Sequence, residues 1–211
     1  AARERAGLLR RMRAPRGLVD LASNDYLGLA AHPLVVERTC AAMMKLGVGS
    51  GGSRLLTGQR DAFSELEERL AAFSGTEAAL LFTSGYAANL GLLTAVVGWD
   101  DLVVSDNRNP ASLIDGIRLT GARKVVYPHG DVEAIGAALR QPRAGRAFVV
   151  TESVFSMDGD LAPLAELVDV AERHGALVLV DEAHATGLYG KRGAGRVEEL
   201  GLSQRVLATV H

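Results

Sequence analysis

The feature that most constrains the fold is a run of four apolar residues, Leu177–Val180, which ends abruptly in the charged segment DEAHATG. A short continuous apolar run of this kind predicts a strand that is buried in a parallel sheet. Ligands of open α/β sheets lie beyond the carboxyl ends of the strands, where Asp181 and His184 are expected. A carboxylate there can hold a protonated pyridine-type nitrogen by a charge-assisted hydrogen bond. The alternative is that Asp181 only caps a helix and that His184 lies in a satisfied core.

The composition is that of an ordinary globular protein. The chain has 211 residues, of which 48% are hydrophobic and 23% are charged. A net charge of -2 gives no reason to expect nucleic acid or an anionic membrane surface as a partner. No apolar run reaches the length of a membrane span, and no metal site is predicted. Cys40 is the single cysteine, which excludes an internal disulfide and favours a reducing compartment, the cytoplasm.

Apolar runs alternate with helical segments along most of the chain. We expect strands at 102–104, 124–127, 147–151, 177–181 and 206–209, with helices at 111–120, 132–139 and 163–174. This alternation predicts an α/β fold with a mostly parallel sheet that is covered on both faces. Residues 1–32 are expected to form an N-terminal arm, and residues 33–211 the domain that carries the sheet.

Residues 79–89 suggest an anion-binding site. A short strand is expected at 79–82, followed by Thr83, Ser84 and Gly85 and then by a helix. The free N–H groups and the dipole of a helix start attract a phosphate, and Gly85 allows it to come close. Tyr86 would lie beside that phosphate. The alternative is that the hydroxyl group of Thr83 or Ser84 simply caps the helix.

Five motifs follow one another along nearly the whole chain: SNDYLGL at 23–29, GSGGSRLLTG at 49–58, SGYAAN at 84–89, TESVFSMDGD at 151–160 and DEAHATG at 181–187. Together they resemble the α-oxoamine synthases, which are pyridoxal-phosphate (PLP) enzymes with the aspartate-aminotransferase-like fold type I. The resemblance implies a homodimer whose active site lies at the interface, near residues 49–58. It also implies a chain nearly twice as long, so that this sequence would be a truncated large domain without the small C-terminal domain.

The resemblance assigns roles to the candidate residues. Asp181 would hold the pyridinium nitrogen of PLP and so make the ring an electron sink. His184 would hydrogen-bond the phenolic oxygen of the ring, Ser156 would bond near that oxygen, and Thr209 would reach the phosphate. The segment near the phosphate, with the backbone of its last two residues in contact with the cofactor, would consist of Ser84, Gly85 and Tyr86.

Two positions depart from the family pattern. The lysine that forms the Schiff base with PLP in the family would be the residue directly after His211, where the sequence ends. Pro110 stands where the family usually has a histidine that stacks on the cofactor and helps to handle the acyl substrate. Proline can pack against a ring, but it cannot donate a hydrogen bond or move a proton.

The resemblance implies a decarboxylative condensation of an amino acid with an acyl thioester on CoA or on acyl carrier protein. The expected pairing is L-alanine with a pimeloyl thioester, and the alternative is glycine or serine with another acyl-CoA. A PLP-binding or partner-binding homologue without turnover is a second alternative, which Pro110 and the missing lysine motivate. A hydrolase built from Ser156, His184 and Asp181 is disfavoured because the sequence lacks a Gly-x-Ser-x-Gly elbow.

Overall fold

The computed structural model describes residues 2–7, 9 and 19–211, and the chain divides into two compact units, 1–48 and 49–211. The first unit contains α1 (Ala2–Arg5) and α2 (Pro33–Leu46), and α2 begins at the proline, a favoured residue in the first turn of a helix. The proposed division into an arm, 1–32, and a domain, 33–211, stays a prediction. No helix in the described part of the chain is long and apolar enough to cross a membrane.

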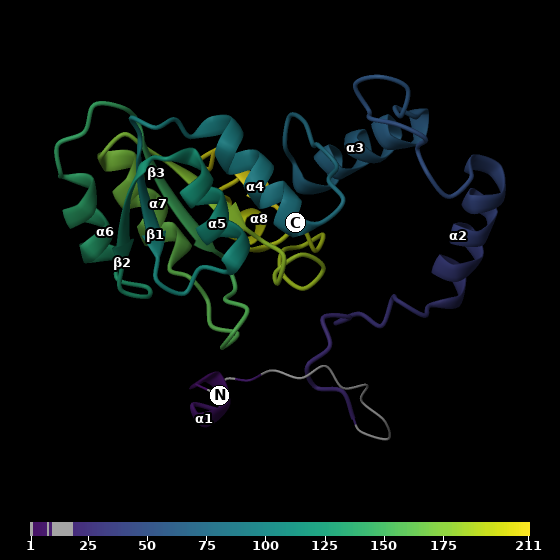
Figure 1. The fold of residues 1–211 in the computed structure, drawn as a ribbon, viewed down its shortest axis with the longest axis horizontal. Coiled ribbons are helices and arrows are strands. Elements are labelled where there is room, and N and C mark those ends of the chain that lie inside the picture. The colour runs from purple at the N-terminus through teal and green to yellow at the C-terminus, as the bar shows by residue number, and fades with distance from the viewer. Residues whose placement is uncertain (1, 8, 10–18) are drawn as a thin grey trace. The chain divides into compact units, whose positions relative to one another are not determined.

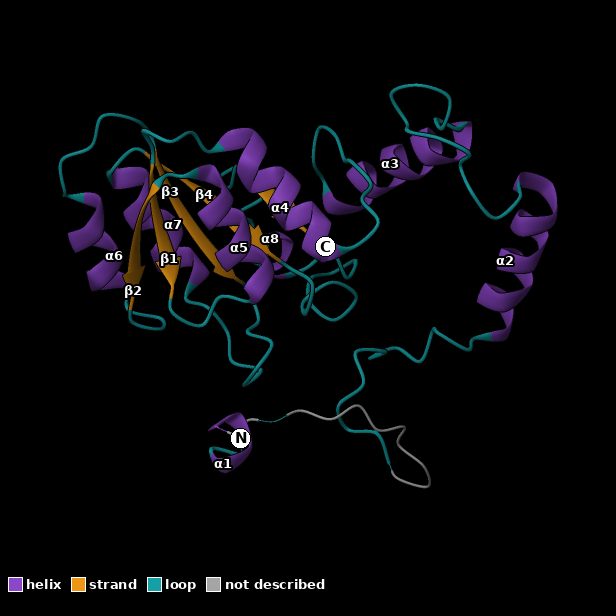
Figure 2. Cartoon of the chain, in the orientation of Figure 1, coloured by secondary structure: helices purple, strands orange, loops and turns teal. Residues whose placement is uncertain are grey.

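The second unit alternates strands and helices (Figure 1, Figure 2). Its elements are α3 (Asp61–Ser74), α4 (Gly85–Val96), β1 (Leu102–Asp106), α5 (Ala111–Thr120), β2 (Arg123–Tyr127), α6 (Val132–Leu139), β3 (Ala147–Glu152), α7 (Leu164–Arg173), β4 (Ala176–Asp181), α8 (Arg196–Glu199) and β5 (Ala208–Val210). The helices expected at 111–120 and 132–139 have these bounds, and the other elements expected from residue 102 onward lie within two residues of their predicted ends.

The sheet has five strands in the order β2-β1-β3-β4-β5, and every neighbouring pair is parallel. The predicted α/β architecture is therefore confirmed. In the register, Glu152 at the end of β3 lies opposite Asp181 at the end of β4, and Thr209 of β5 lies opposite Val180. Parallel pairing thus brings the polar residues that follow β1, β3 and β4 to one edge of the sheet.

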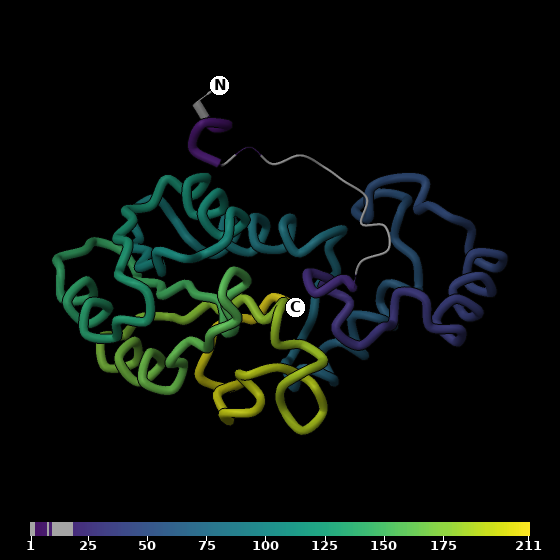
Figure 3. The backbone as a smooth tube through the Cα atoms, turned by 90° about the horizontal axis from the view of Figure 1, so that it is seen from below, coloured from purple at the N-terminus to yellow at the C-terminus, as the bar shows by residue number. Residues whose placement is uncertain are grey.

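Two apolar layers cover the sheet because alternate residues of each strand point to opposite faces. Val103, Phe148 and Leu179 pack with residues of α4 and α5, whereas neighbours such as Val104 and Val178 pack with α6 and α7. In Figure 3 the teal helices α4 and α5 and the green helix α7 lie on opposite sides of the strands. The central strands are therefore buried on both faces, as the apolar run at 177–180 predicts.

The prediction of a strand at 79–82 is wrong, because this segment pairs with none of the described strands. Instead, the backbone N–H of Leu81 donates to the Glu67 carboxylate on α3, at 2.8 Å. Arg54 binds both oxygens of the same carboxylate, at 2.7 and 2.9 Å, and these bonds lower the pKa of Glu67 to about 2. Glu67 thereby fastens both the glycine-rich loop at 49–58 and the segment 79–82 to α3.

Candidate active site

Three buried carboxyl groups end three neighbouring strands: Asp106 on β1, Glu152 on β3 and Asp181 on β4. Their exposed fractions are 3%, 2% and 7%. Strand β3 lies between the other two, so the carboxyl edge of the sheet carries a row of acidic groups. Burying several carboxylates together is costly unless hydrogen bonds or cations compensate them. The contacts of each group therefore indicate what the site can bind.

Asp181 is held by two uncharged donors. The side-chain amide of Asn89 on α4 donates to Oδ2 at 2.7 Å, and the backbone N–H of Ala183 donates to Oδ1 at 2.9 Å. Each carboxylate oxygen can accept a further bond. None of the described helices begins directly after Asp181, and its bond to the Ala183 N–H belongs to the turn that follows β4. Asp181 is a nearly buried carboxyl group whose plane is fixed and which has acceptor capacity left for a cationic N–H group.

The start of α4 has a capping residue, Ser84, and open space beside Gly85. Ser84 is the N-cap residue, and its hydroxyl accepts a hydrogen bond from the Ala87 N–H at 3.1 Å, so the expected capping occurs. Apart from the adjacent residues and the backbone of its own helix, nothing lies within 4 Å of the position that a Cβ on Gly85 would take. The Tyr86 hydroxyl donates to Asp115 on α5 at 2.8 Å. Gly85 and Asn89 are four residues apart, about 6 Å along the helix axis, so the helix start lies about one turn from Asp181.

His184 and Thr209 lie on segments that flank Asp181. His184 is half-buried in the turn after β4, where the N–H groups of Ala185 and Thr186 both donate to the Glu182 carbonyl at 2.9 Å. Thr209 lies on β5, next to β4, and its hydroxyl pairs with Nε2 of His211 at 2.8 Å. Strand pairing and the tight turn therefore keep both candidate residues near the end of β4.

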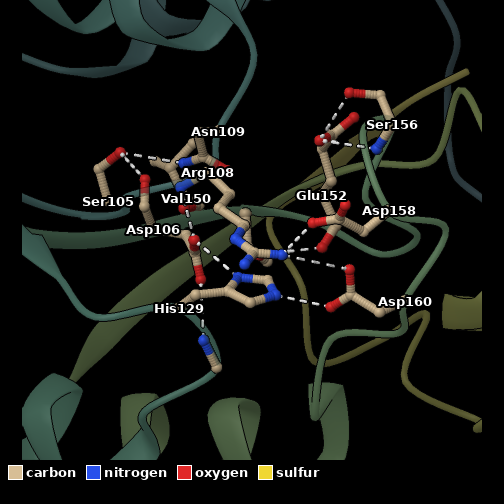
Figure 4. Close-up of polar contacts among 12 residues, drawn as sticks. Ser105, Asp106, Arg108, Asn109, His129, Val150, Glu152, Ser156, Asp158 and Asp160 are labelled. Carbon is tan, nitrogen blue, oxygen red and sulfur yellow. Dashed lines mark hydrogen bonds and ion pairs between the residues drawn. The ribbon is translucent and has the colours of Figure 1, made fainter.

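Ser156 contacts the candidate site through Glu152. Its backbone N–H and its hydroxyl both point to Oε2 of Glu152, at 3.3 and 3.5 Å (Figure 4). Burial raises the pKa of Glu152 to about 7, and the negative charges of Asp181 and Asp106 act in the same direction. The hydrogen bonds from Ser156 oppose this rise. Glu152 is thus a carboxyl group that changes protonation near neutral pH beside Asp181.

A histidine clasp fastens the loop that carries Ser156. His129 lies between two carboxylates, with Nδ1 3.0 Å from Asp106 and Nε2 2.6 Å from Asp160 (Figure 4). Although burial opposes protonation, the hydrogen bonds to both carboxylates raise the pKa of His129 above its ordinary value. Arg108 adds an ion pair to Asp158 in the same loop. The clasp joins the ends of β1 and β2 to residues 156–160.

Pro110 is the N-cap residue of α5 and is half-buried. Its carbonyl accepts the Ile114 N–H at 3.1 Å, so the residue begins the helix in the usual way. The preceding Asn109 is buried, and its amide donates to Ser105 at 3.0 Å and to the Val150 carbonyl at 2.8 Å. The proline is therefore held at the carboxyl edge of the sheet between β1 and α5.

Sequence reasoning missed Asn89, Glu152 and His129 as site residues. Asn89 is the last residue of the motif SGYAAN at 84–89. Its signal in the sequence is a polar amide four residues after Gly85 in an otherwise apolar helix. Glu152 gave the same signal as Asp181, a carboxyl group at the end of an apolar strand, whereas His129 gave none, because its contacts come from the loop at 156–160.

Comparison with known proteins places this geometry in a family. The family model described as "Aminotransferase class I and II" matches residues 16–210. The chain belongs to the class I and II aminotransferases. An 8-amino-7-oxononanoate synthase of Mycolicibacterium gilvum is 53% identical over 204 residues, which are 95% of this chain and 54% of that protein. The chain therefore spans about half the length of this curated relative.

Solved structures within the same family share the fold. A serine palmitoyltransferase from S. paucimobilis, solved with bound PLP-myriocin aldimine, matches with a TM-score of 0.84 at 40% identity, covering 87% of this chain and 46% of that one. An 8-amino-7-oxononanoate synthase from Francisella tularensis matches with a TM-score of 0.74 at 28% identity, covering 88% of this chain and 51% of that one. The resemblance to the α-oxoamine synthases, and with it the expected fold type I, is confirmed.

Proposed function

We propose that the protein is a PLP-dependent acyltransferase that condenses L-alanine with a pimeloyl thioester, carried by CoA or by acyl carrier protein. The alanine α-carbon forms a bond to the thioester carbonyl, the thiol leaves, and the alanine carboxyl group is lost as CO2. The product is 8-amino-7-oxononanoate, a biotin precursor. The 53% identity to a synthase with this name supports the choice of substrates.

The observation that carries the proposal is the setting of Asp181. A carboxylate that is 7% exposed and held by uncharged donors is stabilised by a cation, and a protonated pyridine ring supplies one with an N–H to donate. The start of α4, with room beside Gly85, suits a phosphate group. The residues present therefore fit PLP, which when bound acts as an electron sink for the α-carbon of the amino acid.

The other residues would bind and orient. His184 and Ser156 would hydrogen-bond near the phenolic oxygen of the cofactor, and Thr209 would bind its phosphate. Ser84, Gly85 and Tyr86 would supply the helix-start end of the phosphate site. A lysine directly after His211 would anchor the cofactor and carry the proton taken from the α-carbon. Pro110 would pack against the cofactor or acyl chain without moving a proton.

We also propose a cytoplasmic homodimer with the active site at its interface. The family resemblance of residues 49–58 supports the dimer. The single exposed Cys40 supports a reducing compartment.

The test is thiol release by the protein expressed from its natural gene. Three pairs are compared: L-alanine with pimeloyl-CoA, glycine with acetyl-CoA, and L-serine with palmitoyl-CoA. We expect kcat/KM to be at least about tenfold higher for the first pair. Asp181→Asn should abolish most of this activity, whereas the matched control Asp131→Asn, at the exposed N-cap of α6, should retain it.

Two results would change the proposal. A preference for glycine or serine would keep the reaction type and replace the substrates. The second candidate, a homologue that binds PLP without turnover, is favoured by Pro110, whose ring cannot donate a hydrogen bond. Bound PLP with no thiol release from any pair would support it.

A further inference from the structure

Asn89 connects the end of β4 to two helices. It lies on α4, is 2% exposed, and uses its side-chain amide twice. Nδ2 donates to Oδ2 of Asp181 at 2.7 Å and to the Ser112 hydroxyl on α5 at 3.0 Å. An amide nitrogen has two hydrogens, so both are committed and the side chain has one orientation.

The packing of α4 on α5 makes this contact possible. Gly116 lies one turn after Ser112, and a Cβ on it would stand 2.6 Å from Cδ1 of Leu93 and 3.3 Å from the Asn89 carbonyl. Leu93 is fully buried. Glycine at this position therefore lets α5 approach α4 closely enough for the Ser112 hydroxyl to meet the Asn89 amide.

The two donors to Asp181 act on different oxygens. Asn89 holds Oδ2 from α4, and the Ala183 N–H holds Oδ1 from the turn after β4. Together they fix the plane of the carboxylate. A hydrogen bond to a ring nitrogen is directional, so the strength of that bond depends on how the plane is held.

We propose that Asn89, anchored by Ser112, is a positioning residue that aims the Asp181 carboxylate at the ring nitrogen of PLP. This inference rests on the proposed cofactor site. Asn89 needs no contact with the cofactor or substrate, because it acts through Asp181. Asn89 is distinct from the candidate catalytic group. Its loss should first change the protonation of the ring nitrogen of PLP.

The experiment uses the protein expressed from its natural gene and loaded with PLP that carries 15N at the ring nitrogen. The 15N chemical shift reports protonation of that nitrogen, and dialysis reports PLP retention. Asn89→Ala should move the shift toward the unprotonated value and weaken retention by about tenfold or more, as expected for a hydrogen bond to a charged group. Ser112→Ala should give a smaller change in the same direction.

Two controls separate positioning from a merely structural role. Thr94→Ala removes an exposed hydroxyl on α4 that bonds only to its own helix, at Leu90 and Gly91, and it should change neither readout. The second control replaces PLP by its analogue with carbon in place of the ring nitrogen. Retention of that analogue should be equal in the wild type and in Asn89→Ala, because Asp181 then has no N–H to accept.

An unchanged 15N shift in Asn89→Ala, or an equal loss of PLP and of the analogue, would overturn the positioning role while leaving the proposed function intact. A wild-type protein that binds no PLP would overturn both. If Asn89→Ala does not fold, the 15N chemical shift and PLP retention are measured in Ser112→Ala instead. An unchanged 15N shift in that variant also overturns the proposal.

Discussion

Glu152 lies in surroundings that differ from those of an exposed glutamate. It is buried at the end of β3 and faces Asp181 across the strand pair. Its pKa of about 7 in the folded protein lies above the ordinary value of 4.5, with burial as the main cause. Between these two pH values the folded protein binds more protons than the unfolded chain, so stability falls as the pH rises.

Glu152→Gln should remove this pH dependence. Glutamine keeps an oxygen that can accept from Ser156 but carries no charge. The difference in the free energy of unfolding between the variant and the wild type is compared at two pH values. We expect this difference to favour the variant by up to about 3 kcal/mol more at pH 8 than at pH 4.5. Urea unfolding across this range measures the effect. The matched change Glu77→Gln, at an exposed position, should leave the pH profile as it was.

At this scale the sequence predicted Asp181 well, because an apolar strand that ends in a carboxylate restricts where the group can lie. It also allowed two interpretations of Ser84, and the structure shows the cap without testing the phosphate role. It could not predict the partner of Asn89. The amide reaches Asp181, 92 positions away in the chain, only because α4 lies over β4.

At the scale of the elements, α4 and α5 pack closely where Gly116 of α5 meets Leu93 of α4. Gly116→Ala should destabilise the protein by about 1–3 kcal/mol, because the added Cβ would overlap Leu93 and crowd the Asn89 carbonyl. Gly136→Ala is the matched control on α6. A Cβ there would meet its neighbours at 3.6 Å, an ordinary contact, so the better helix propensity of alanine should stabilise by about 0.5–1 kcal/mol.

Thermal unfolding of the two variants checks this prediction. A Gly116→Ala protein as stable as the wild type would show that α5 can move away from α4 without cost. It would also remove the packing argument for the Ser112–Asn89 contact.

The histidine clasp makes the loop at 156–160 sensitive to pH. His129 has a raised pKa, so its stabilising contribution is fully present below the ordinary value near 6.5 and is lost as the pH rises through the raised value. Asp160 has a lowered pKa, so its part is lost as the pH falls through that lowered value. The facing groups are Asp106, Asp160 and the neighbouring Arg108.

His129→Gln should therefore cost most near pH 5–6, about 1–2 kcal/mol, and least in alkaline solution. Hydrogen exchange of the amides at 153–161, measured at pH 5.5 and pH 9, checks the effect. Faster exchange in the variant at both pH values alike would show that the clasp acts by shape alone and not by charge.

Most elements were predictable because each strand is a short apolar run and each helix begins at a clear signal. The segment 79–82 was not, although its four residues are also apolar or small. Strand formation needs a partner, and none of the described strands pairs with it. Sequence reports what a segment can form, whereas the Glu67 carboxylate decides where the Leu81 N–H is satisfied.

At the scale of the whole molecule, the carboxyl edge of one parallel sheet gathers residues from segments far apart in the chain. The order β2-β1-β3-β4-β5 places β4 between β3 and β5, so Glu152, Asp181 and Thr209 come from adjacent strands. Family membership follows from a match over residues 16–210. We propose that this edge is the PLP site of an α-oxoamine synthase.

Borohydride reduction tests this claim most directly. The protein expressed from its natural gene is reduced, digested and mapped by mass spectrometry for a phosphopyridoxyl group. We predict one label, on a lysine directly after His211, and loss of most of the label in Asp181→Asn. A protein without any label, or with the label on Lys124 or Lys191, would contradict the claim.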